Sequence, residues 1–151
     1  DGLALLKLVI HCQSSSLVAG SMLGIDVDDR LEITRCFHVP GDDDSDDYQM
    51  DMMKTLREVN VDNNCVGWYK SFFASFCQTS VVETQFQYQE NLNENCVVIL
   101  YDRRARAYRL TDEFMQHQNQ YVSQVLEELP LKIRNPGLIT AFLFDVYDAG
   151  L

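Results

Sequence analysis

The residues that could bind a metal or act as nucleophiles are dispersed along this chain of 151 residues. Its three histidines, His11, His38 and His117, show neither the H-x-H nor the H-E-x-x-H spacing of metal-binding motifs. The five cysteines include no C-x-x-C pair, and their odd number and irregular spacing favour core thiols in a reducing compartment over disulfides. Folding could bring two histidines together, but the spacing alone favours surface or partly buried histidines.

Residues 66–83 form the segment that carries most information, VGWYKSFFASFCQTSVVE. Ser71 and Ser80 have no histidine near them in sequence that could act as a base. Glu83 could offer an oxygen to a metal, but a single carboxylate is more simply explained as the ion-pair partner of Lys70. From these residues alone, the segment therefore offers no complete catalytic or metal-binding set.

The same segment closely resembles the signature of the MPN (JAB1/MPN/Mov34) family, in which G-W-Y-H-x-H-P precedes a serine and an aspartate. In catalytic members, two histidines and the aspartate hold zinc, and an earlier glutamate acts as general base. The resemblance places Lys70 and Phe72 at the histidine positions and Glu83 at the aspartate position. It places Leu17, in LVAGSMLG, at the glutamate position. This resemblance implies a degenerate metalloprotease-like site with no catalytic residue, no metal and no cofactor.

Motifs outside this segment narrow the resemblance to one branch of the family. They occur in one colinear order from the first residue to about residue 135: DGLALLKLVIHCQ, DDRLEITRCF, CVVILYD, AYRLTDEFM and EELPLKIRN. They are similar to a non-catalytic MPN subunit of eukaryotic translation initiation factor 3. The resemblance implies a cytoplasmic scaffold that pairs with a second MPN subunit, the f subunit, and with helical-bundle subunits. It also implies a role in assembling the 40S pre-initiation complex and recruiting mRNA.

Two other functions remain open at this point. A non-catalytic MPN scaffold of the proteasome lid or the signalosome would share the same degenerate segment. A zinc-dependent isopeptidase is disfavoured, because loss of even one ligand weakens zinc binding and Lys70, Phe72 and Leu17 all depart from the catalytic pattern.

The fold class that the resemblance implies is α/β. We expect an MPN domain with a mixed, mostly antiparallel sheet flanked by helices over residues 1–135, and the start of a C-terminal helical extension over residues 136–151. A chain of 151 residues with 46% hydrophobic content is long enough for one domain with a real core.

The charge of the chain limits its partners. A formal net charge of -11 disfavours a protein that grips RNA with its whole surface, because phosphate binding depends on clustered Lys and Arg. Part of the acidity lies in GDDDSDDYQ, which favours a solvated loop over a cation site or a contact with a basic partner. No apolar run approaches the ~20 residues that span a bilayer. We therefore expect little direct nucleic-acid binding and no membrane contact.

Hydrophobic periodicity predicts the elements of the N-terminal half. LALLKLVIHCQ is predicted to be an amphipathic helix, and residues 17–27 and 30–39 to be two adjacent antiparallel strands joined at Asp28 and Asp29. A second helix is predicted over residues 48–59 and a short strand over residues 65–71. A third helix should begin near Ser80.

The C-terminal half is predicted to contain a central strand, CVVILYD, that is buried on both faces, with RARAYRL partly exposed beside it. The join LYDRRARAYRL is shorter than in the family, as is the segment around residues 115–125. Pro130 suits an edge strand, and Asn135 with Pro136 can start a terminal helix.

Two apolar helix faces are candidates for contact with other subunits. The first helix repeats Leu3, Leu6 and Ile10 at helical spacing, and the terminal helix repeats Leu138, Phe142 and Val146. The terminal helix would pack on the core of its own domain, on an intersubunit bundle, or on both. The surroundings of Trp68 and Tyr69 are a further candidate that rests on the resemblance alone.

Overall fold

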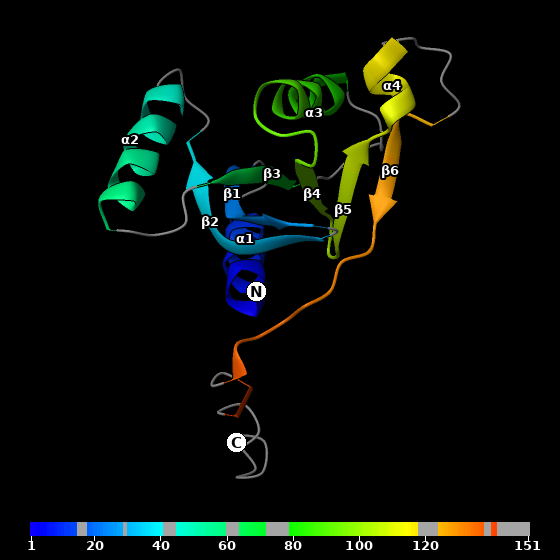
Figure 1. The fold of residues 1–151 in the computed structure, drawn as a ribbon. Helices are drawn as coiled ribbons and strands as arrows, with labels where there is room; N and C mark the ends of the chain where they lie inside the picture. The colour runs from blue at the N-terminus through cyan, green and yellow to red at the C-terminus, as the bar shows by residue number, and fades with distance from the viewer. Residues whose placement is uncertain are drawn as a thin grey trace.

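One mixed sheet of six strands organises the residues that the computed structural model describes, which are 1–14, 18–28, 30–40, 45–59, 64–71, 79–117, 124–137 and 140–141. The strands lie in the order β2-β1-β3-β4-β5-β6 (Figure 1). Their bounds are β1 Ala19–Val27, β2 Arg30–Val39, β3 Cys65–Ser71, β4 Val97–Tyr101, β5 Ala105–Leu110 and β6 Leu126–Leu129. The helices are α1 Gly2–Ser14, α2 Ser45–Glu58, α3 Thr79–Asn91 and α4 Asp112–His117.

The pairing of the strands is mostly antiparallel. β1 pairs with β2 and with β3 in antiparallel fashion, and β4–β5 and β5–β6 are antiparallel as well. Only the β3–β4 pair is parallel in the described sheet, and α3 belongs to the connection between these two strands. A parallel pair requires such a crossover. The expected α/β class, with a mixed and mostly antiparallel sheet flanked by helices, is confirmed.

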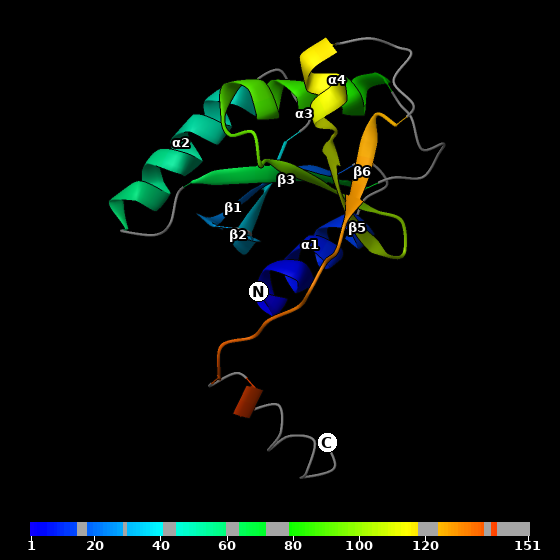
Figure 2. The same ribbon diagram turned by 45° about the vertical axis from the view of Figure 1, so that its right-hand side comes forward.

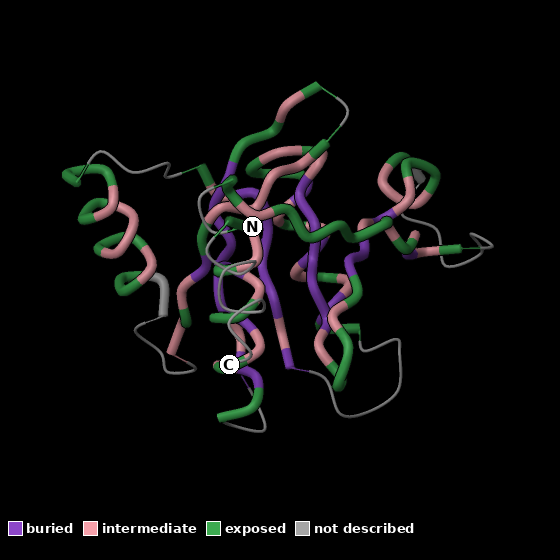
Figure 3. The backbone as a smooth tube through the Cα atoms, turned by 90° about the horizontal axis from the view of Figure 1, so that it is seen from below, coloured by how far each residue is buried: buried purple, intermediate pink, exposed green. Residues whose placement is uncertain are grey.

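Strand β4 alternates between the two faces of the sheet, as expected for a central strand that is buried on both sides. Val97 and Ile99 belong to the core under α1, whereas Val98 and Leu100 belong to the core under α3. The two helices thus cover opposite faces (Figures 1 and 2). Figure 3 shows buried residues along the central strands.

The β1–β2 hairpin turns at Asp28, whose φ of 49° lies in the left-handed region that aspartate tolerates. At the other end of β1, Gly20 is paired with Tyr69 of β3. A Cβ atom on Gly20 would overlap the Tyr69 ring. The close approach of this ring therefore requires glycine at position 20.

The segment that follows β6 leaves the sheet and runs toward the start of α1 (Figure 2). The backbone N–H of Gly2 donates a 3.1 Å hydrogen bond to the Asn135 side-chain oxygen. Pro130 lies directly after β6, which is an edge strand of the described sheet, as predicted. Thr140 N–H donates to Pro136 O, which agrees with a helical start there, but Leu138, Phe142 and Val146 lie outside the described residues.

Candidate functional site

The segment that resembles a metal site lies where the start of β1 meets the end of β3. Val18 N–H donates to Ser71 Oγ at 2.8 Å, and Ser71 N–H donates to Val18 O at 2.8 Å. These bonds form because the antiparallel register pairs Ala19 with Lys70. Leu17 and Phe72 lie outside the described residues.

Glu83 lies on the exposed side of α3. That helix buries Val81, Gln85 and Gln89 at four-residue spacing, so residue 83, two positions away, lies on the opposite face. The expected ion pair between Lys70 and Glu83 is wrong, because both residues are described and the salt bridges in the described chain are Arg30–Glu32 and Arg109–Glu127.

These positions do not fit a zinc ion. The Lys70 side chain ends in an ammonium group, which has no lone pair with which to bind a metal ion. The side chain of Glu83 lies on the outer face of its helix. Leucine at position 17 and phenylalanine at position 72 contribute hydrocarbon only. Within the described ranges no group of three or more His, Cys, Asp or Glu side chains could hold a metal ion.

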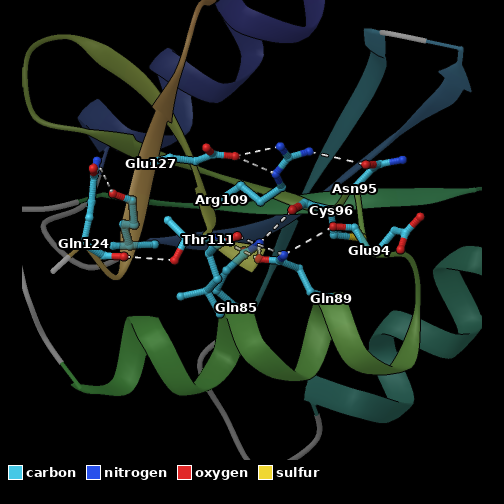
Figure 4. A network of polar contacts seen from close by, with 11 residues as sticks. Gln85, Gln89, Glu94, Asn95, Cys96, Arg109, Thr111, Gln124 and Glu127 are labelled. Carbon is cyan, nitrogen blue, oxygen red and sulfur yellow. Dashed lines mark hydrogen bonds and ion pairs between the residues drawn. The ribbon is translucent and has the colours of Figure 1, made fainter. Parts of the chain in front are cut away.

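A buried glutamine network instead holds α3 on the sheet next to β3, β4 and β5 (Figure 4). Trp68 Nε1 donates to Gln85 Oε1 at 2.9 Å, and Gln85 Nε2 donates to Cys96 O at 2.7 Å. Gln89 Oε1 accepts the backbone N–H of Leu110 at 2.8 Å. Each buried amide replaces water with a protein partner, so α3 is held by specific bonds as well as by apolar packing.

The strand pair at the far edge is joined by a more exposed polar chain (Figure 4). Arg109 of β5 contacts Glu127 of β6 at 2.6 Å and donates to Asn95 Oδ1 at 3.3 Å. Asn95 Nδ2 in turn donates to Asp26 Oδ2 at 2.9 Å. This chain connects β1, the loop before β4, β5 and β6, so it has a structural role.

On the other face of the sheet, α1 covers a group of residues that spacing alone did not bring together. His11 Nδ1 lies 2.8 Å from Tyr69 Oη, and the His11 and His38 rings lie 5.9 Å apart. Burial, then the nearby His38 and Lys7, lower the pKa of His11. No sequence motif signals this pair, because position 11 is on a helix and position 38 on a strand.

Two cysteines complete this layer as buried thiols. Burial raises the pKa of both Cys12 and Cys36 to about 11, so both are neutral at physiological pH. Cys36 Sγ donates to Ala4 O at 3.3 Å. The interpretation of these cysteines as core residues is supported, and the four described cysteines are all free thiols.

Helix α1 has a second apolar face that the described structure does not cover. Its inner face buries Ala4, Leu8 and Cys12. The stripe of three residues that periodicity singled out lies outward instead, with exposed fractions of 52%, 55% and 54% for Leu3, Leu6 and Ile10. We call these three residues the α1 stripe. The stripe is therefore not part of the described core.

Trp68 and Tyr69 are themselves interior residues. Trp68 lies under α3, where its ring stacks on Tyr88, and Tyr69 lies under α1. Both are buried, so neither side chain can form a subunit-facing surface directly.

In the described part of the chain, no helix is long and apolar enough to span a membrane.

Comparisons with known proteins match this chain in two ways. The model of the JAB1/Mov34/MPN/PAD-1 ubiquitin protease family matches residues 1–94. Curated proteins named as the H subunit of eukaryotic translation initiation factor 3 match almost the whole chain. The Dictyostelium discoideum protein is 38% identical over 176 residues, covering 96% of this chain and 55% of that protein. The Arabidopsis thaliana protein is 38% identical over 177 residues, covering 97% and 52%, respectively.

The chain therefore spans about half the length of the curated relatives it matches. The alignments are also longer than the chain, so these relatives contain residues that this sequence lacks. This agrees with the short joins that the sequence shows against the family. The resemblance of the motifs to the MPN family is confirmed. Their narrower resemblance to an MPN subunit of eukaryotic translation initiation factor 3 is confirmed as well.

Proposed function

This chain belongs to the JAB1/Mov34/MPN/PAD-1 family, and we propose that it is a structural, non-catalytic MPN subunit of the eukaryotic translation initiation factor 3 complex. The relatives that it matches carry the name of the H subunit of that factor. Translation initiation is thus the process in which the chain acts, and the cytoplasm is the compartment in which we expect it.

The four positions that correspond to the zinc ligands and the base argue against catalysis. Lys70 and Phe72 occupy the imidazole positions, Glu83 the carboxylate position, and Leu17 the position of the base. An ammonium group and two hydrocarbon side chains cannot replace these donors. Without a bound metal and a base, a water molecule would have no means of activation at these positions.

Pairing with a second MPN subunit, the f subunit, is the positive part of the proposal. The observation that carries it is the α1 stripe: three large apolar side chains stay more than half exposed although the opposite face of the same helix is buried. An apolar stripe at i, i+3 and i+7 is the pattern by which helices dock on apolar partners. In the C-terminal extension, we expect Leu138, Phe142 and Val146 to serve the helical-bundle subunits.

Contact with the 40S subunit and mRNA would then be made through the complex. The net charge of -11 leaves this chain a poor general binder of phosphate backbones. We propose that it contributes to assembly of the 40S pre-initiation complex and to mRNA recruitment by positioning the neighbouring subunits of the factor.

Mass spectrometry of the native assembly that contains this polypeptide tests the proposal. We expect the f subunit and other initiation factor 3 subunits, together with 40S proteins. Recovery of proteasome-lid or signalosome subunits without any initiation-factor subunit would replace the proposal with the sister-assembly alternative. A stoichiometric zinc content with chelator-sensitive cleavage of ubiquitin chains would overturn its non-catalytic part.

A further inference from the structure

Cationic side chains lie beside the α1 stripe and near both ends of α1. From this arrangement we propose that α1 docks a partner helix whose apolar residues are flanked by acidic side chains, and that it disfavours a second copy of this chain. The proposal rests on the proposed function and specifies the chemistry of the subunit that α1 contacts. The cations would determine which partner helix binds, whereas the apolar side chains of the stripe would supply the affinity.

The first cation beside the stripe is Lys7 of α1 itself. Lys7 follows Leu3 by four residues and precedes Ile10 by three, so its stem lies directly beside both on the helix surface. Its side chain is exposed, which leaves the ammonium group free to meet a partner at the rim. Beyond Lys7 on the same side lies His11, which is already bonded to Tyr69.

A second set of cations lies in the segment of residues 130–135, which follows β6. It leaves the sheet at the end where the β4–β5 turn lies and reaches the start of α1, where Asn135 accepts the hydrogen bond from Gly2 N–H (Figure 2). Leu131, Lys132, Ile133 and Arg134 are all exposed. Cationic and apolar side chains alternate here, so the segment brings two exposed positive charges toward the start of α1.

The C-terminal end of α1 has cations nearby as well. Gln13 Nε2 donates to Tyr101 Oη at 3.2 Å, and the exposed Arg103 and Arg104 follow Tyr101 in the β4–β5 turn. Asp1, directly before α1, and Asp102, in the β4–β5 turn, add carboxylates here. Lys7, Arg103, Arg104, Lys132 and Arg134 therefore place positive charge around α1 on a chain whose formal net charge is -11.

This charge pattern selects between possible occupants. A two-fold pair of identical chains would bring the same patch against itself, and its cations would then repel one another. A helix with Asp and Glu beside its apolar residues would complement the rim instead. Leucine and isoleucine offer no aromatic face on which a nucleobase could stack, so the exposed apolar area favours protein over RNA.

Binding of the purified full chain to the purified f subunit, measured by calorimetry over a range of salt concentrations, tests this inference. The variant Lys132→Glu/Arg134→Glu reverses two exposed charges whose side chains make no hydrogen bond in the described structure. We expect its affinity at low salt to fall about tenfold and its salt dependence to flatten. The matched control, Lys54→Glu/Arg57→Glu on the exposed side of α2, should bind as the unaltered chain does.

The outcomes separate this inference from the proposed function. If Leu6→Asp abolishes binding while the charge-reversed variant binds normally at every salt concentration, the acidic-partner inference fails and the pairing stands. If the unaltered chain does not bind the f subunit at all, both fail. A stable dimer of the isolated chain in sedimentation, or tight binding of a single-stranded RNA homopolymer that the same reversal removes, would also overturn the inference.

Discussion

Trp68 and Tyr69 are neighbours in the chain, yet they serve opposite faces of the sheet. Trp68 donates to Gln85 under α3, and Tyr69 contacts His11 under α1. A strand sends successive side chains to opposite faces, so this part of β3 anchors both covering helices at once. Substitutions at single residues in this strand should therefore affect one helix or the other.

The first prediction at this scale concerns the charge of His11. Its folded-state pKa is lowered, so the unfolded chain binds a proton more readily near pH 6.5. The stability that neutral His11 provides is complete above pH 6.5 and is lost as the pH falls toward the folded-state pKa. The groups that face it are His38, Lys7 and Tyr69.

Urea unfolding from pH 8 to pH 5.5 checks this prediction. The unaltered chain should lose stability over the lower part of the range, and His11→Gln should lose less over the same interval. Identical pH profiles for the two proteins would show that His11 does not contribute to the pH dependence.

The second residue-scale prediction concerns the degenerate metal-site positions. The double variant Lys70→His/Phe72→His should show no zinc-dependent hydrolysis of ubiquitin chains, because Leu17 supplies no base and Glu83 lies on the exposed side of α3. A catalytic MPN isopeptidase serves as the positive control. Chelator-sensitive cleavage by the double variant would contradict the prediction.

At the scale of elements, α3 depends on its buried glutamines. Gln85 is fully buried and accepts from Trp68 while donating to Cys96 O and Gln89. Gln85→Ala would leave these buried polar groups without a hydrogen-bond partner, because water does not reach them. The substitution should reduce the free energy of unfolding by about 2–4 kcal/mol. The exposed Gln87 on the same helix is the matched control, and its alanine variant should change stability by less than about 0.5 kcal/mol.

Thermal and urea unfolding of the two variants decide this prediction. Equal stability of the Gln85 and Gln87 variants would mean that α3 is held by apolar packing alone.

The contact between β1 and β3 supports a second prediction at this scale. Gly20→Ala would place a methyl group well inside van der Waals contact with the Tyr69 ring and should destabilise the domain by about 1–3 kcal/mol. Gly137→Ala meets nothing within 4 Å and should be neutral within about 0.5 kcal/mol. A Gly20 variant as stable as the Gly137 variant, measured by urea unfolding, would refute the steric argument.

The elements with clear periodicity were predictable from the sequence. β4, a continuous apolar run, is central and buried on both faces, and the β1–β2 hairpin turns where two acidic residues interrupt the pattern. The short helix α4 is not predicted, because six residues leave too little periodicity to detect. Its place on the sheet depends on Phe114 and Met115, which pack against the core under α3.

The site was predictable only in part, because its geometry depends on the fold. The ion pair expected between Lys70 and Glu83 is absent because α3 buries the face of residues 81, 85 and 89. The outward stripe of α1 was visible as a pattern, but periodicity alone cannot show which of two apolar faces meets the sheet. The inner face belongs to Ala4, Leu8 and Cys12, because the small side chains at positions 4 and 12 allow closer approach to the strands.

At the scale of the whole molecule, the domain combines an interior held by specific bonds with an apolar helix face left open. Its two covering helices pack on opposite sides of one sheet, and α1 alone presents large aliphatic side chains outward on a regular stripe in the described chain. The chain spans about half the length of its curated relatives. The proposed scaffold role would depend on the surface that α1 presents.

Co-purification of the full chain with the f subunit, comparing Leu6→Asp with Leu92→Asp, tests this account most directly. Both leucines are more than half exposed, at 55% and 57%, so neither change should alter the melting temperature appreciably. A buried aspartate at the centre of the α1 stripe should reduce binding at least tenfold, by about 1.4 kcal/mol or more, while the Leu92 variant binds normally. Equal recovery of the f subunit with both variants would contradict the claim that α1 is the pairing surface.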